Sequence, residues 1–355
     1  MRRTWPFLLI FAVLVLAGVL LHLVLGSVRI PVARTIAILA GRTAGPESGF
    51  DIWRRIVLEF RLPRAVTALT AGAGLAVCGV LMQTLFRNPL AGPFVLGVNS
   101  GASLGVALVV LAGSSIGSTL VAGSGLLSGA QLGGDLAIAV AAVAGSAVVL
   151  LAVLAVSRIV DSVLTLLVLG VLFSYAVGAV VSVLMHFSIP EEIQSYINWT
   201  FGSFGGVTVP QLPLIVVPVA AGITGAAFLT KPLNALLLGE QYAASMGVRV
   251  RVVRNLAILV TAVTAGVITA FCGPIGFLGV AVPHLVRAMA RNSDHRVIIP
   301  LCALSGAAVA LFADLLAALP GTSLTLPLNA VTALIGAPVV IGVVIGRGGL
   351  GERFS

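Results

Sequence analysis

The side chains that could do chemistry are few in this sequence, and they lie far apart. Its four histidines fall in unrelated segments, and none has a second histidine or a carboxylate at the spacing of a metal site. Nucleophile motifs are absent, as is the glycine-rich phosphate loop of nucleotide-binding proteins. We therefore predict no catalytic residue, no metal site and no cofactor bound by this chain, so that energy for any work must come from another protein.

Asp314 is the one carboxylate that lies deep in a late apolar run. Ionisable groups at membrane depth are costly, and they usually mark a functional site. Asp314 falls near the end of its run, however, so a structural role at the membrane surface is at least as good an interpretation. The sequence leaves both interpretations open.

The composition of the chain indicates which elements must position these residues. Hydrophobic residues make up 59% of its 355 residues and charged residues only 9%, which a fold surrounded by water cannot accommodate. The net charge of +9 suggests nucleic-acid binding at first, but the basic residues lie at the ends of apolar runs, as in membrane proteins. We expect an all-α polytopic protein that contacts membrane lipid and binds no nucleic acid.

Apolar runs recur along the sequence and predict about ten transmembrane helices, each able to cross ~30 Å of hydrocarbon. The first run, from Phe7 to Leu25, follows a basic start but is longer than the apolar region of a signal peptide, so we interpret it as a retained helix. All the runs belong to one membrane domain over residues 1–355. The later runs lie at about 62–85, 93–112, 134–156, 162–185, 210–230, 255–272, 275–290, 297–316 and 326–346.

Charged residues indicate the orientation of these helices. An even number of spans places both termini on one side, and arginines near both ends of the chain favour the cytoplasm. An amphipathic outer loop at about 27–61 is the exception, because it is also rich in arginine. Either these arginines reach lipid phosphates, or they form a patch that receives an acidic protein or ligand.

A polar interruption from Lys231 to Arg254 contains the only lysine of the chain. The predicted orientation places this loop in the cytoplasm, and its small residues between Gly239 and Gly247 predict a short helix. We interpret the loop as the site through which another protein drives this one. The three arginines that follow Gly247 are interpreted separately, as anchors for the next helix at the inner leaflet.

Small residues and prolines suggest how the helices pack. Glycines repeat at a spacing of four, as in Gly101 with Gly105 and Gly202 with Gly206, which favours close helix contacts. Prolines within or beside the runs predict broken helices, and such backbone is tolerated at membrane depth when it is buried in protein or lines a cavity. The candidate residues for a translocation pathway or gate are Gln83, Asn88, Pro89, Asn99, Pro283 and His284.

Four stretches of the sequence resemble, in order, the signature segments of a single family. They are RLPRAVTALTAGAGLAVCGVLMQTLFRNPLAGPFVLGVNSGA at 61–102, LGEQYAASMGV at 238–248, GPIGFLGVAVPHLVRAMARNSDHRVIIP at 273–300 and LPLNAVTALIGAP at 326–338. The chain is identified by these stretches as a member of the FecCD-type permease family of ABC importers, which carries iron-siderophores, haem or cobalamin.

The resemblance implies a type II ABC importer permease architecture in the bacterial cytoplasmic membrane. It implies a dimer with a second permease subunit, two cytosolic ATPase subunits that use ATP and Mg, and an extracytoplasmic substrate-binding protein. Arg61 and Arg64 match arginines that dock the binding protein. The residues that match the ATPase-coupling segment are Gly239, Glu240, Ala243, Ala244 and Gly247.

Departures from the family pattern affect docking and gating rather than catalysis. The usual arginine shortly after the Asp314 position appears as Ala318, and the usual Glu-Leu-Pro-Val-Gly appears as residues 325–329, ending in Asn329. The family's commonest substrate favours a ferric siderophore, with haem or cobalamin as alternatives. An ion-coupled secondary transporter is the alternative from another class, and the scarcity of ionisable groups near the middle of the spans argues against it.

Overall fold

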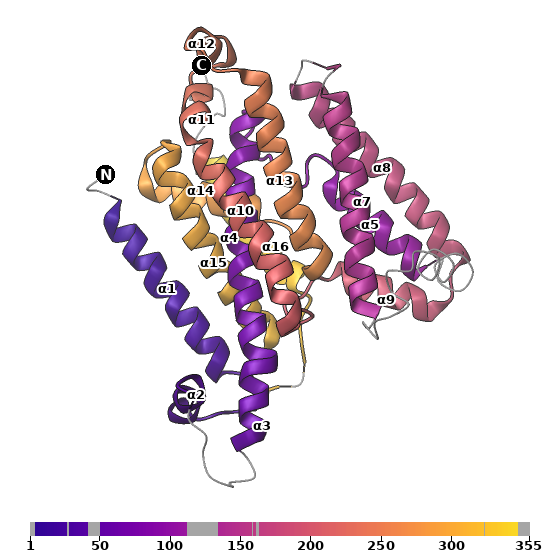
Figure 1. The fold of residues 1–355 in the computed structure, drawn as a ribbon, viewed down its shortest axis with the longest axis vertical. Helices are drawn as coiled ribbons and strands as arrows, with labels where there is room; N and C mark the ends of the chain where they lie inside the picture. Colours follow the sequence, from indigo (N-terminus) through magenta and orange to yellow (C-terminus); the bar gives the residue numbers. More distant parts are fainter. Residues whose placement is uncertain are drawn as a thin grey trace.

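In a computed structural model the chain folds into a bundle of long helices (Figure 1). The structure describes residues 4–26, 28–41, 50–111, 134–157, 159–160, 163–322 and 324–346, and within these ranges it contains helices and turns but no strand. Seven of its helical segments are long and apolar enough to cross a membrane, and three shorter apolar helices accompany them. The all-α class and the approximate number of spans predicted from the sequence are therefore confirmed.

The long elements follow the predicted runs closely. They are α1 (Trp5–Val24), α4 (Leu62–Leu85), α5 (Val98–Val110), α7 (Gly134–Val156), α8 (Val163–Phe187), α10 (Leu212–Phe228), α13 (Val250–Cys272), α14 (Leu278–Ala290), α15 (His295–Ala318) and α16 (Leu328–Gly346). Shorter helices connect them: α2 (Val32–Leu39), α3 (Phe50–Arg55), α9 (Pro190–Thr200), α11 (Thr230–Leu237) and α12 (Glu240–Ser245).

Two helices start later than the apolar runs predict. Gly97 has φ +76° immediately before α5, and Phe277 has φ +66° immediately before α14, so a right-handed helix cannot extend back through either residue. Each helix has 13 residues and spans roughly 20 Å, less than the hydrocarbon thickness. The non-helical segments that precede them lie inside the protein, since Leu96 and Ile275 are buried. Such burial is the condition under which irregular backbone is tolerated at membrane depth.

Helix α4 is the centre of the bundle, with 89% of its most apolar stretch buried. Glycines allow its neighbours to approach closely. A Cβ at Gly72 would overlap the carbonyl of Gly306 on α15, and a Cβ at Gly79 would overlap the carbonyl of Gly279 on α14. Small residues at crossing points bring backbones into direct contact, which is how membrane helices commonly associate.

Of the two glycine pairs predicted to form close helix contacts, only one does so. Gly101 and Gly105 face α7, where an added Cβ would overlap the carbonyls of Gly145 and Ala141, so this pair does support helix packing. Gly202 instead lies in a turn with φ +72°, and nothing lies within 4 Å of the Cβ position of Gly206. The interpretation of this second pair as a helix contact was wrong, because α9 ends at Thr200.

The helices form two groups around α13. In Figure 1, α5, α7, α8 and α9 lie together on one side, while α1, α10, α14, α15 and α16 surround α4 on the other. A large buried cluster of apolar side chains surrounds α4 and extends to Leu150 on α7 and Leu166 on α8, and a smaller cluster lies among α5, α7, α8 and α9. Because α13 packs against α4 and α10 as well as α5 and α7, it joins the two groups.

The two ends of the bundle carry different short elements. Helices α11 and α12 lie at one end, and α2 and α3 lie at the other (Figure 1). Helix α3 continues through a π-helical segment, Ile56–Arg61, into α4, so the second long helix extends well beyond the predicted start near residue 62. Pro63 lies at the second position of α4, where its missing N–H leaves the carbonyl of the preceding turn without its usual donor.

Candidate functional site: a coupling element and an outer charge cluster

The predicted coupling segment forms a separate small unit at one end of the molecule. Helix α12 has six residues, and glycines in unusual backbone conformations stand on either side of it, Gly239 at φ +120° and Gly247 at φ +83°. Side chains with a Cβ are strained at such angles, so glycine is required for these two sharp turns. The turns make α12 project from the end of the bundle (Figure 1).

The exposed surface of α12 and its flanking residues is mixed, with three large apolar side chains among polar ones such as Gln241 and Ser245. Leu238, Tyr242 and Met246 are each more than half exposed. Ala244 is exposed as well, whereas Ala243 is fully buried and accepts a hydrogen bond at its carbonyl from the N–H of Val248 (3.0 Å). Ala243 and the two glycines thus shape the element, while Leu238, Tyr242 and Met246 present apolar area that a protein partner can cover.

Arg254 belongs to this element, contrary to the sequence analysis, which assigned it to lipid anchoring. Its guanidinium lies 3.5 Å from the carboxylate of Glu240, and its side chain is buried. The pair ties the first residue of α12 to the second turn of α13. The correction has a simple physical cause, because Arg254 lies on the face of α13 that turns toward the protein. Arg249 and Arg251 are exposed.

A network of polar side chains joins α11 to the core. The amide of Asn234 donates to the carboxylate of Asp294 (2.7 Å), and its oxygen accepts from the backbone N–H and the Nδ1 of His295 (2.9 and 2.7 Å). Hydrogen bonds from the N–H of Arg296 and from Asn234 lower the pKa of Asp294, which caps α15 as a carboxylate. Nothing in the sequence singled out Asn234 for this role, because it is one of several polar residues in the Lys231–Arg254 loop.

A second charge cluster lies near the opposite end, where α1, α4 and α15 meet. Arg64 donates two hydrogen bonds to the carboxylate of Asp314, at 2.7 and 2.9 Å, and the Nε2 of His22 lies 3.0 Å from the same carboxylate. Asp314 is only 1% exposed, while Arg64 is 29% exposed. These contacts give Asp314 a structural role, because its carboxylate connects three helices.

Arg61 points into the protein instead of toward the outer surface. Its guanidinium donates to the carbonyls of Leu23 and Val24 at 2.9 Å each and also to the carbonyl of Val28, and the residue is 8% exposed. The carbonyls of Leu23 and Val24 end α1 and have no partner within that helix, while Val28 lies just beyond it. Arg61 therefore caps α1, and of the two arginines predicted to dock a partner only Arg64 retains some exposure.

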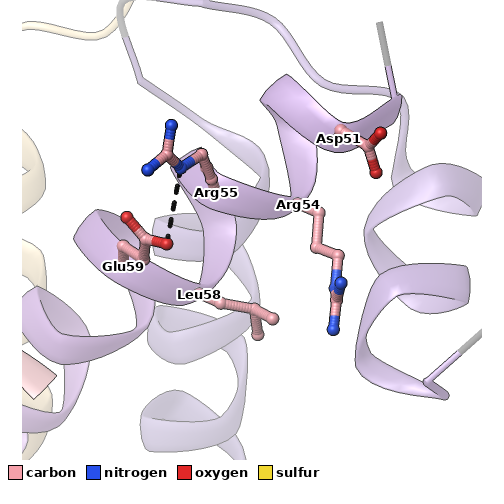
Figure 2. A pocket seen from close by; sticks show the side chains of 5 residues that line it. All are labelled: Asp51, Arg54, Arg55, Leu58 and Glu59. Carbon is pink, nitrogen blue, oxygen red and sulfur yellow. Dashed lines mark ion pairs between the residues drawn. The ribbon is translucent and has the colours of Figure 1, made fainter. Parts of the chain in front are cut away.

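Other charged residues surround a shallow hollow on the outer side of α3. Figure 2 shows Arg55 facing Glu59 across one helical turn, with Arg54 pointing away from that pair. The ion pair measures 3.6 Å, and both side chains are largely exposed. Asp51 and Leu58 complete the lining of the hollow. This surface carries both signs of charge, so it is less basic than the count of arginines in the predicted outer loop suggested.

The predicted pathway residues divide between two places. Gln83 on α4 donates to the carbonyl of Val280 on α14 (3.3 Å) and accepts from Arg287, and the Nε2 of His284 donates to the carbonyl of Pro89 (2.7 Å). Pro283 is buried in the middle of α14. The side-chain oxygen of Asn88 accepts from the N–H of Leu90, which forms the turn after α4.

Asn99 lies apart from these residues, near the start of α5, and its buried side-chain oxygen has no hydrogen-bond partner among the described residues. That these six residues line a translocation pathway or gate stays a prediction.

The departure at Asn329 has a structural explanation. Its side-chain oxygen accepts from the N–H of Gly276 at 3.0 Å, and its own N–H donates to the carbonyl of Phe201, also at 3.0 Å. Glycine at this position would provide only the second bond. Asn329 therefore fastens the segment before α14 to the start of α16 and to the end of α9. Ala318, the other departure, is the last residue of α15.

A bundle of helices that can span a membrane, with a short helix projecting from one end, has the architecture of a membrane transport protein. The profile of the FecCD transport family matches residues 13–346, so the chain belongs to that family, as the resemblance in the sequence predicted, and it is the permease subunit of an ABC importer.

Proteins of similar sequence and a solved structure of similar fold both agree with this assignment. Over 349 residues the chain is 35% identical to the vitamin B12 import system permease protein BtuC of Escherichia coli O127:H6 (strain E2348/69 / EPEC), covering 98% of this chain and 97% of that protein. The protein of the same name from Shigella sonnei (strain Ss046) is 34% identical with the same coverage. A solved structure of a metal-chelate type ABC transporter, in an inward-facing conformation, is 28% identical and superposes with a TM-score of 0.80 over 96% of this chain and 99% of that one.

Proposed function

We propose that this chain imports an organic metal chelate across the bacterial cytoplasmic membrane, as part of a complex with a second permease subunit, two ATPase subunits and an extracytoplasmic binding protein. The observation that carries the proposal is α12, a short helix between two glycines with positive φ, which together with its flanking residues exposes Leu238, Tyr242 and Met246 at one end of the bundle. ATP and Mg act in the partner ATPase, which supplies the energy that this chain cannot release itself.

The mechanism follows from the connections of α12. Closure of the ATPase dimer on ATP moves the helix seated in its cleft, and the motion passes to the spans, which alternate between inward-open and outward-open packing. Such a change requires the ATPase to contact the two states with different free energies. Glycine contacts between α4, α14 and α15 favour movement of these helices as packed bodies.

Cobalamin is the first substrate to test, because permeases named for vitamin B12 import match 98% of the chain. A ferric siderophore, the substrate favoured by the sequence analysis, and haem are the alternatives. Purified complex in proteoliposomes should accumulate one of these chelates only when ATP is present and the binding protein is supplied. Accumulation driven by a proton or sodium gradient without ATP would contradict the proposal and favour a secondary transporter.

Substitutions on α12 should separate ATP hydrolysis from uptake. We expect Ala244→Arg, Glu240→Arg and Gly247→Val to reduce uptake by at least about tenfold, since each puts charge or bulk into the contact or strains the turn beside it. Ser245→Ala is the matched control, because its hydroxyl bonds only the carbonyl of Tyr242 in the same helix. Variants that assemble with the ATPase and still import at the wild-type rate would remove α12 from the coupling contact.

We also propose that the outer end around Arg64 receives an acidic lobe of the binding protein, while Arg61 holds the end of α1 in place. Charge reversal in Arg54→Glu, which leaves the pair of Arg64 with Asp314 intact, should weaken docking about 10-fold or more at low salt, and the difference should shrink as salt screens the charges. Leu58→Ala serves as an uncharged control in the same hollow. Binding-protein affinity that is equal for all variants at low ionic strength would contradict this assignment.

A further inference from the structure

Asn234 holds the coupling element to the rest of the protein at a point that the proposed function does not use. The residue lies on α11, five positions before Gly239, where α12 begins. Both polar atoms of its side chain are engaged, the nitrogen with Asp294 and the oxygen twice with His295. Three short hydrogen bonds from one side chain fix α11 against the first turn of α15.

The connection continues from α15 to the centre of the bundle. His295 is buried, and its Nε2 lies 2.8 Å from the hydroxyl of Thr84 on α4. That hydroxyl lies 2.8 Å from the carbonyl of Val80, one turn earlier in α4. A continuous chain of polar contacts therefore runs from α11 through the start of α15 into the most buried helix of the protein.

Other contacts between the coupling element and the core are weaker or more local. Arg87 donates to the carbonyl of Leu236 at 3.4 Å, near the limit for a hydrogen bond. The pair between Arg254 and Glu240 fastens α12 to α13, the helix that already follows it in the chain. The buried side chains of Leu233 and Leu236 also pack α11 against the core, but Asn234 makes the polar side-chain contacts from α11 to the start of α15. Helices α15 and α4 are themselves locked together where Gly72 meets Gly306.

We propose that Asn234 is a positioning residue for transport, which transmits displacement of α12 through His295 and Thr84 to the α4–α15 pair. This inference rests on the proposed function, because it assumes that a partner ATPase moves α12. Side-chain contacts of this kind modulate the coupling between distant sites when they join elements that have two arrangements. The alternative is that Asn234 only stabilises the fold, and the two roles predict different measurements.

The test uses the full complex with its ATPase and binding protein in proteoliposomes. The probe is cobalt-labelled cyanocobalamin or radioiron-labelled ferrichrome, whichever the wild-type complex accumulates. Asn234→Ala should lower the amount of probe imported per ATP hydrolysed by about 2- to 30-fold, the range that contacts of this kind carry. Thr230→Ala is the matched control, since its exposed hydroxyl lies on the same helix and bonds only the carbonyl of Ala227.

Thr84→Val tests the far end of the connection without touching α11. We expect a smaller loss of import per ATP than in Asn234→Ala, and we expect the double variant to be no worse than Asn234→Ala alone, because both changes interrupt one connection. If Asn234→Ala does not assemble, Thr84→Val decides the question by itself, and unchanged import per ATP in that variant overturns the proposal.

The remaining outcomes also discriminate. A purely structural role for Asn234 would lower thermal stability and reduce ATP hydrolysis and import in the same proportion, leaving import per ATP at the wild-type value, and this result overturns the proposal. Import per ATP that is lowered equally by Thr230→Ala would overturn it as well. A wild-type complex that accumulates neither probe with ATP would count against the proposed function instead.

Discussion

Asp314 connects three helices because it accepts from side chains that come from both of its neighbours. Arg64 reaches it from α4 with two hydrogen bonds, and His22 reaches it from α1. The Nδ1 of His22 lies 2.9 Å from the carbonyl of Gly18, so the imidazole is held between two acceptors. A carboxylate buried in this way is stable only while its partners remain, since an unpaired charge at this depth is costly.

Asp314→Asn should therefore destabilise the protein. Removal of one partner from a buried pair costs up to about 3–5 kcal/mol, and the partial exposure of Arg64 places the expected loss toward the lower end of that range. The thermal midpoint of the purified permease in detergent measures the effect.

Glu59→Gln is the control for that measurement. It breaks an ion pair whose side chains are 77% and 53% exposed, which is worth at most about 1 kcal/mol. Equal midpoints for Asp314→Asn and Glu59→Gln would show that the cluster does not hold the three helices together.

Arg61 and Arg254 show where linear charge patterns fail. Both were read as residues that face water or lipid headgroups, yet both side chains are buried. A sequence shows that a guanidinium lies near the end of a helix, but the helix face it occupies decides whether the group meets water or backbone carbonyls. Arg61 meets the carbonyls at the end of α1, and that end is distant in sequence.

Helix crossings in this protein depend on glycines that sequence spacing identifies only in part. Gly101 and Gly105 pack against α7 as predicted, whereas the contacts of Gly79 with Gly279 and of Gly72 with Gly306 join different segments. A repeat within one helix can be recognised in the sequence. A match between two helices requires knowing which of them are neighbours.

Gly79→Ala should disrupt the crossing of α4 and α14. The added methyl group would overlap a backbone carbonyl, which cannot rotate away, so we expect a loss of at least about 1–3 kcal/mol or failure to assemble. Thermal midpoints and the yield of monodisperse protein measure the change.

The matched control for this crossing is Gly178→Ala on α8, where nothing lies within 4 Å of the new group. Alanine there should be neutral or slightly stabilising, because it favours the helix by about 0.5–1 kcal/mol over glycine. If both variants behaved alike, close backbone approach would not be what holds α4 against α14.

At the scale of the whole molecule, the number and positions of the long helices could be predicted from the apolar runs of the sequence. Every predicted run contains a long or short apolar helix, because burial in hydrocarbon requires continuous apolar sequence. The late starts of α5 and α14 were not predicted, since φ at Phe277 is set by tertiary contacts rather than by residue type. The position of α12 was predictable from Gly239 and Gly247, but the contacts that attach it were not. The partner of Asn234, Asp294, lies far along the chain, and the partner of Arg254, Glu240, lies on the other side of a turn.

The contacts between helices show which elements share an end of the bundle, and the charge pattern then predicts which end faces the cytoplasm. Contacts of His22 with Asp314 place the end of α1 beside the end of α15, while the start of α15 meets α11 through Asn234. The start of α1 therefore lies toward the end that carries α12, as Figure 1 also shows. Lys231, Arg249 and Arg251 lie close to α12 in the sequence, and basic residues of this kind mark the cytoplasmic side.

Cysteine labelling can test this orientation without removing the native cysteines, because Cys78, Cys272 and Cys302 are all buried. A membrane-impermeant maleimide added to intact spheroplasts should label Asp51→Cys on α3 but not Ser245→Cys on α12, since both original side chains are exposed but lie at opposite ends of the bundle. After permeabilisation both variants should react. Labelling of Ser245→Cys in intact spheroplasts would place α12 outside, where no cytosolic ATPase could reach it, and would overturn the coupling proposal along with the orientation.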